Sequence, residues 1–238
     1  LSGGVLASDR SGSISGKFAR ADFVPTALTP NSLSRLILEE SATAESKKSG
    51  TMSADKIDVA FVPGTKDADP VPRQLTATGH ASAESKGDIL KADSIEAVLA
   101  KNEKGGIDVA TAHASGAVSF VSERERVQAN ANEMRADLGW TGLSGADLKA
   151  GRRQIVELMG EGARVVHTGK SEEISTIRGD QIRLNGVAQA IEVFGPGSFD
   201  HNNPGKAVVT ASWTSGMSFD NSSGKLECAG DAVAVSSP

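Results

Sequence analysis

A short motif that recurs along the chain constrains the fold more than any other feature. Residues 42–47 (ATAESK) and 81–86 (ASAESK) share five of six residues at an offset of 39 positions. Glycine-centred elements recur with similar spacing, in steps of 37, 44, 35 and 35 residues, at Gly79, Gly116, Gly160, Gly195 and Gly230. Such spacing is typical of stacked repeats, in which no single unit buries its apolar face alone. We therefore predict one array of about six degenerate repeats over residues 1–238.

Apolar residues within the repeats alternate with polar ones. Ile57, Val59 and Phe61 are an example, and Gly-rich or Asn-rich segments such as residues 104–106, 202–205 and 220–224 separate these runs. A period of two places one face of a strand in the core, and the intervening segments have turn composition. The sequence therefore predicts an all-β, antiparallel protein.

Two segments also have helical spacing. Residues 32–45 carry Leu33, Leu36, Ile37 and Glu40 at helical intervals, but part of this segment aligns with the strand-like residues 75–86. We follow the repeat and predict a strand there. For residues 147–160, an inserted helix and an extended hairpin both remain open.

Composition excludes several functional classes. The net charge is −5, aromatic residues make up 4% of the chain, and Tyr is absent, so a nucleic-acid partner is not expected. The four histidines lie 33, 54 and 34 residues apart, without the spacing of a zinc site. No phosphate loop or nucleophile elbow is present. We predict no enzymatic activity, no catalytic residue, no metal and no cofactor.

Three residue types have competing interpretations. The repeated Asp22, Asp55, Asp93 and Asp180 are interpreted as turn or strand-start carboxylates rather than a cation ladder. Cys228 alternates with Leu226 and is interpreted as a small buried hydrophobe. The basic pairs at 47–48, 124 and 126, and 152–153 suit solvated hairpin tips, or a rim that meets the phosphates of a glycolipid.

The C-terminal repeat carries a family resemblance. Residues 217–235 read as a strand, an Asp-x-x-Ser-Gly turn, a strand, a glycine corner and a strand, and residues 179–184 read Gly-Asp-x-Ile-x-Leu. Together they resemble the OstA-like family of lipopolysaccharide-transport proteins, which includes a periplasmic bridge protein and a bitopic inner-membrane component. The resemblance covers residues 127–238 well and 1–126 loosely, which suggests a subdivision into OstA-like C-terminal repeats and divergent N-terminal ones.

The resemblance implies an open, twisted antiparallel β-jellyroll in which two facing sheets hold acyl chains. It also implies lipopolysaccharide or another glycolipid as the ligand and a periplasmic location, and it leaves open an anchor upstream of Leu1. Inward apolar residues of the predicted strands become the candidate lipid-binding set. They are Val118, Phe120, Ile182, Leu184, Val193, Trp213, Met217 and Phe219.

Two further expectations concern partners and an alternative function. The closing strand, residues 231–236, has no Lys, Arg or Pro. Edge strands that remain solitary are usually blunted by such residues. We therefore expect edge-strand pairing with other β-jellyroll transport proteins, or head-to-tail self-association. The alternative function is a structural or adhesive β-repeat spacer of a larger surface protein. A spacer should have a dry, filled core, whereas a carrier should have an elongated apolar cavity.

Overall fold

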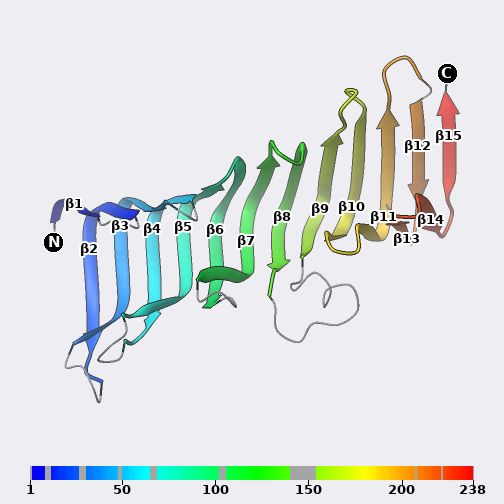
Figure 1. Ribbon diagram of the computed structural model, residues 1–238. Helices are drawn as coiled ribbons and strands as arrows, with labels where there is room; N and C mark the ends of the chain where they lie inside the picture. The colour runs from blue at the N-terminus through cyan, green and yellow to red at the C-terminus, as the bar shows by residue number, and fades with distance from the viewer. Residues whose placement is uncertain are drawn as a thin grey trace. The chain divides into compact units, whose positions relative to one another are not determined.

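The computed structural model describes residues 2–8, 12–26, 31–47, 50–64, 69–101, 106–139, 154–206, 208–220 and 222–237 (Figure 1). Over these residues the chain forms fifteen β-strands and no helix. The strands are β1 (Ser2–Ser8), β2 (Gly12–Val24), β3 (Ser32–Ser46), β4 (Gly50–Val62), β5 (Val71–Ser85), β6 (Asp88–Lys101), β7 (Ile107–Ser122), β8 (Val127–Asp137), β9 (Ile155–Thr168), β10 (Ile174–Asn185), β11 (Ala190–Asn202), β12 (Val208–Trp213), β13 (Gly216–Asp220), β14 (Lys225–Ala229) and β15 (Val233–Ser237). The predicted all-β, open antiparallel fold is confirmed.

The strands belong to one antiparallel sheet whose order follows the chain from β1 to β12. At its C-terminal end, β11 pairs with β12 over one half and with β13 over the other, β15 follows β12, and β14 follows β13. The described residues pack into two units, Leu1–Ala114 and Ser115–Pro238. The subdivision at residue 126 concerns sequence similarity to a family and stays a prediction.

Four of the recurring glycines, Gly79, Gly116, Gly160 and Gly195, lie at corners within the long strands, whereas Gly230 lies between β14 and β15. At each corner the register shifts, as between Gly179 and Gln181 in both pairings of β10. The odd-numbered strands supply residues with positive φ at this level: Glu40, Ser41, Gly79, His80, Gly116, Ala117, Gly160, Gly162 and Gly195. A β-bulge bends its strand and strengthens the local twist. The recurring glycines of the sequence therefore mark a bend that successive strand pairs repeat at corresponding positions.

The repeated acidic element lies opposite these corners. Asp55 packs over Gly79, where an added Cβ would lie 2.2 Å from its Oδ2, and Asn132 packs in the same way over Gly160. Asp55 also contacts His80, with 3.1 Å between Oδ2 and Nδ1. Asp22 differs, since it pairs with Arg35 away from the corner of β2. The prediction of turn or strand-start carboxylates is wrong, because Asp22, Asp55, Asp93 and Asp180 all lie within strands, in β2, β4, β6 and β10. The described residues contain no group of carboxylates that could hold a metal.

In each unit a row of buried apolar side chains crosses the strands beside the corners. In the first unit the row is Leu38, Ile57, Ala77 and Ile95, each at most 2% exposed. In the second unit the row, here called the bend row, is Met134, Leu158, Ile182, Val193 and Met217. Cross-strand neighbours of this kind are the unit of sheet stabilisation.

The structure decides between helix and strand where its residues are described. Residues 32–45 lie in β3, as the repeat predicts. Of the ambiguous segment 147–160, residues 155–160 lie in β9, and residues 147–153 lie outside the described residues. Cys228 lies half-buried on β14 rather than fully buried, and burial raises the pKa of its thiol. No helix long and apolar enough to cross a membrane occurs in the part of the chain that the structure describes.

Candidate ligand-binding cavity

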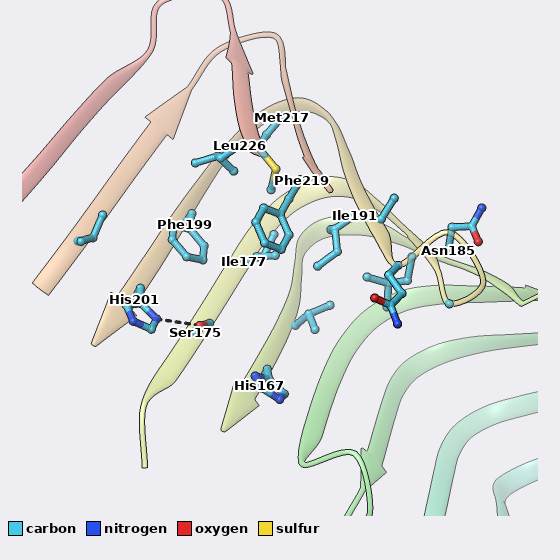
Figure 2. Close-up of a pocket in the computed structure, with 16 residues that line it drawn as sticks. His167, Ser175, Ile177, Asn185, Ile191, Phe199, His201, Met217, Phe219 and Leu226 are labelled. Carbon is cyan, nitrogen blue, oxygen red and sulfur yellow. Dashed lines mark hydrogen bonds between the residues drawn. The ribbon is translucent and has the colours of Figure 1, made fainter. Parts of the chain in front are cut away.

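The second unit encloses a cavity of about 750 Å³ between the two halves of its bent strands (Figure 2). The first arm consists of residues 163–168 of β9, 174–179 of β10 and 197–202 of β11, with β12 and β15. The second arm consists of residues 155–159 of β9, 181–185 of β10 and 190–194 of β11, with β13 and β14. The two facing layers expected from the sequence are thus, in this unit, two arms of one sheet.

The side of the cavity next to the bend is closed by packing. Ala163, Gly179 and Gly197 are paired neighbours on the first arm, and they leave room for the larger bend row on the second. A Cβ on Gly179 would lie 2.4 Å from Cγ1 of Val193 on the other arm. Within the first arm, a Cβ on Gly197 would lie 2.7 Å from Cζ2 of its strand partner Trp213. The arms therefore touch at Gly179 and Val193 and close the bend there, while Met217, at the end of the bend row, still lines the cavity.

Further from the bend the arms separate and their facing side chains are apolar. Val165, Ile177 and Phe199 form a cross-strand row on the first arm. The row on the second arm consists of Leu184, Ile191, Phe219 and Leu226. All seven line the cavity, and Figure 2 shows Ile177 and Phe199 gathered with Ile191 and Phe219 around one space. This middle zone offers dispersion and hydrophobic contact, but no hydrogen bonds from side chains.

The free end of the first arm is polar. His167 and His201 both pair with Ser175, and the three residues form the mouth row. Oγ of Ser175 lies 3.0 Å from Nδ1 of His201, and the imidazole stacks on Phe199 with 6.3 Å between ring centroids and 7° between planes. The hydrogen bond with Ser175 and the stacking on Phe199 therefore fix the imidazole of His201 at the edge of the apolar zone.

A carboxylate lies beside the mouth row. Backbone hydrogen bonds, first from the N–H of Glu173 itself and then from that of Ser171, lower the pKa of Glu173, and the nearby His167 and His201 add to this effect. The Ser171 bond to Oε2 is 2.9 Å long. The turn can hold this carboxylate because residue 169 is glycine, whose Cβ would lie 1.8 Å from Oε1.

The free end of the second arm is a turn that is also polar. Asn185 and Gln189 line the cavity there. Oδ1 of Asn185 accepts hydrogen bonds from the backbone N–H groups of Val187 and Ala188, at 3.1 and 2.9 Å. The backbone N–H of Gly186 donates to the carbonyl of Gln154 at 2.8 Å, which ties the turn to the start of β9. Both lips of the cavity thus present polar groups around an apolar interior.

The eight candidate lipid-binding residues divide into three groups. Leu184, Met217 and Phe219 line the cavity. Ile182, Val193 and Trp213 are buried on the closed side and are not among the lining residues. Val118, which is buried, and Phe120, which is half-buried, lie on β7 outside the lining. A lipid-binding role for the set stays a prediction.

Sequence reasoning missed the lining residues of the first arm. His167 and His201 are separated by 34 residues, close to one repeat step, so the repeat itself places them at the same level of the sheet. That spacing was the available signal. Ser175 lies on β10, which pairs with the strands of both histidines. It gave no signal of its own, because serines are frequent throughout the chain.

No group of His, Cys, Asp or Glu that could hold a metal occurs among the residues that the structure describes. The cavity has an apolar middle and polar lips, so the chemistry it offers is noncovalent binding of an amphiphile. A bent, open β-jellyroll with an apolar space between its arms defines the structural class of this unit.

Among solved structures, the chain is similar to the crystal structure of LptH, described as the LptA homologous periplasmic component of the conserved lipopolysaccharide transport device from Pseudomonas aeruginosa. The TM-score is 0.46 and the sequence identity 11%, over 63% of this chain and 95% of that one. No protein-family model matches the chain. No curated protein matches it either.

Proposed function

We propose that this protein is a non-enzymatic lipid-carrier module that holds acyl chains between the arms of its second unit. The observation that carries the proposal is the cavity, which is closed at the bend, apolar in the middle and polar at both lips. An amphiphile matches this order of environments, with its chain inside and its head group at the mouth. The cavity supports a carrier over a spacer, because a spacer needs only a filled core.

The size of the cavity is sufficient for the proposed cargo. Pockets that bury most of a small ligand measure roughly 300–1,000 Å³, and about 750 Å³ lies within that range. Each buried methylene contributes about 0.8 kcal/mol. A chain of about ten methylenes would contribute roughly 8 kcal/mol, which is comparable with the cost of association, about 4–15 kcal/mol.

The finer assignment rests on the sequence resemblance to OstA-like proteins. It proposes lipopolysaccharide or another glycolipid as the cargo, the periplasm as the location, and other β-jellyroll transport proteins as partners. The C-terminal edge supports such partners, since β15 pairs only with β12 in the described part of the chain and Val233 and Val235 are 60% and 52% exposed. An unguarded edge strand can accept another strand.

Filling the cavity tests the carrier function. Ala190 lines the cavity, so Ala190→Trp should place an indole in the space an acyl chain would occupy. We expect the affinity for a neutral fluorescent acylglycerol probe to fall at least tenfold, and co-purified lipid in mass spectra to be lost.

Ala188→Trp is the matched control, because Ala188 is exposed in the same turn and does not line the cavity. It should bind the probe like the unchanged protein. Equal binding by both variants, or an unchanged protein that binds no probe, would contradict the carrier function.

A further inference from the structure

The mouth of the cavity differs from a site built for anions. None of the lining residues in the described part of the chain is Lys or Arg. Sites that select phosphate or carboxylate usually present Arg or Lys to the anion. Here the groups at the first lip are two imidazoles and one hydroxyl, each able to donate or accept a hydrogen bond.

Charges around this lip balance rather than favour an anion. The adjoining turn carries Lys170, Glu172 and Glu173, and Nη1 of Arg126 donates to the carbonyl of Gly169 at 3.0 Å. These side chains give two positive and two negative charges. An anionic head group at this lip would find no Lys or Arg partner among the described lining residues.

Ligand hydroxyl groups can form hydrogen bonds with each of the polar groups at this lip. A hydroxyl donates one hydrogen bond and accepts two, so it can donate to an imidazole nitrogen while it accepts from Ser175 or the other imidazole. Because a hydroxyl group is uncharged, these hydrogen bonds cause no charge repulsion and bury no ion. The apolar zone begins directly beneath, where Phe199 stacks on His201.

We propose that His167, Ser175 and His201 form a head-group site that selects an uncharged, hydroxyl-rich amphiphile over an anionic one. The site rests on the proposed carrier function, because it positions the head of a molecule whose chain lies in the cavity. Sugars and glycerol share the required hydroxyl chemistry. The cargo class is therefore a neutral glycolipid or acylglycerol. Of the cargoes proposed above, the site thus favours an uncharged glycolipid over lipopolysaccharide, whose phosphates would find no basic partner among the described lining residues.

Head groups on one common chain test the selection. Lauryl maltoside, monolauroylglycerol and lauryl phosphate are compared, below their micellar concentrations, by displacement of the neutral fluorescent acylglycerol probe from the full chain. We expect the neutral compounds to bind roughly tenfold more tightly than the phosphate, the margin that one or two well-formed hydrogen bonds supply. A difference between the maltoside and the glycerol ester identifies which hydroxyl source the site prefers.

Substitutions at the mouth separate head-group recognition from chain binding. His201→Phe keeps a ring against Phe199 but removes both nitrogens, and Ser175→Ala removes the hydroxyl. Both substitutions should reduce the ratio of the affinity for the neutral compounds to that for lauryl phosphate from about ten toward one. Ser198→Ala, on the same strand as His201 but outside the lining, should leave the preference unchanged.

The outcomes distinguish this proposal from the carrier function. Chain-dependent binding without head-group preference, or tighter binding of lauryl phosphate, overturns the head-group site and leaves the carrier function intact. Absence of binding by every lauryl compound overturns both. Melting temperatures of the variants identify any that fail to fold, and His201→Gln, which retains hydrogen-bonding groups, should then restore part of the preference.

Discussion

At the scale of single residues, one turn carboxylate makes stability depend on pH. Oδ1 of Asp220 accepts hydrogen bonds from the hydroxyl and backbone N–H of Ser222, at 2.6 and 2.8 Å, and Oδ2 accepts one from the hydroxyl of Ser223 at 2.9 Å. The Ser222 and Ser223 hydroxyls, then the Ser222 backbone, lower the pKa of Asp220 from 3.8 to about 2. A carboxylate whose pKa is lower in the folded state than in the unfolded state stabilises the folded protein at pH values above its unfolded-state pKa. This stabilisation is lost as the pH falls through the folded-state pKa.

We therefore expect Asp220→Asn to lower the melting temperature at pH 5–7, and the difference to shrink as pH falls from about 4 to about 2. Thermal unfolding at several pH values measures it. A double change, Ser222→Ala with Ser223→Ala, keeps the carboxylate but removes its hydroxyl donors, so it should flatten the same pH dependence. A melting difference that persists unchanged at pH 2 would contradict this assignment.

A second residue-scale prediction concerns the corner of β3. Glu40 has φ 58°, at the repeat position that Gly79 occupies with φ 77° in β5. A left-handed conformation costs a side-chain residue roughly 1–2 kcal/mol, while glycine adopts it freely. The contact between Oε2 of Glu40 and Nζ of Lys17, at 2.7 Å, is exposed and contributes little. Glu40→Gly should therefore raise the free energy of unfolding by about 1 kcal/mol.

Glu39→Gly is the matched control for that change. Glu39 also makes an exposed ion pair, 3.2 Å from Lys56, but it lies in regular strand pairing without positive φ. Glycine there should lower the free energy of unfolding by roughly 0.5–1 kcal/mol. Denaturant unfolding compares the two variants, and a loss of stability in both would show that Glu40 is not strained.

At the scale of strands, the closed bend depends on paired large and small residues. A Cβ at Gly179 would meet Cγ1 of Val193 at 2.4 Å, and the next nearest atom is 3.5 Å away. Gly179→Ala should therefore overpack the bend and destabilise by about 1–3 kcal/mol. Because Val193→Ala removes the opposing methyl group, the double variant should lose less than the sum of the two single losses. Additive losses in a double-mutant cycle would argue against contact between the arms at this point.

The bend also explains how far the sequence could predict the structure. Repeat alignment correctly assigned residues 32–45 to a strand against their helical spacing. Alternation then found Leu184 but missed Ile177 on the same strand, because the corner between Gly179 and Gln181 shifts the inward positions from odd numbers before it to even numbers after it. A period-two pattern carries no information about where such a shift occurs. Contacts between arms, such as the packing of Val193 against Gly179, depend on that shift and were equally hidden.

At the scale of the whole molecule, the C-terminal edge should govern association. Val235 pairs with Thr210 of β12 and is 52% exposed. We expect concentration-dependent association in sedimentation experiments, and we expect Val235→Lys to weaken it, since a lysine on an edge strand opposes the addition of another strand. Val98→Lys places the same charge on the similarly exposed Val98 of β6, which already pairs with β5, and should leave association unchanged. Sedimentation as a monomer at every concentration would contradict self-association through the C-terminal edge strand.

The sequential strand order has a kinetic consequence. Nearly every pairing joins strands that are neighbours along the chain, so the contacts close short loops and do not require distant segments to meet first. Stability in such an array approximates a sum over nearest-neighbour interfaces, and opening can begin at an exposed end without disrupting the rest. Amide protons of β14 and β15 should therefore exchange with solvent sooner than those of β9 and β10, in a graded front that advances strand by strand from the edge.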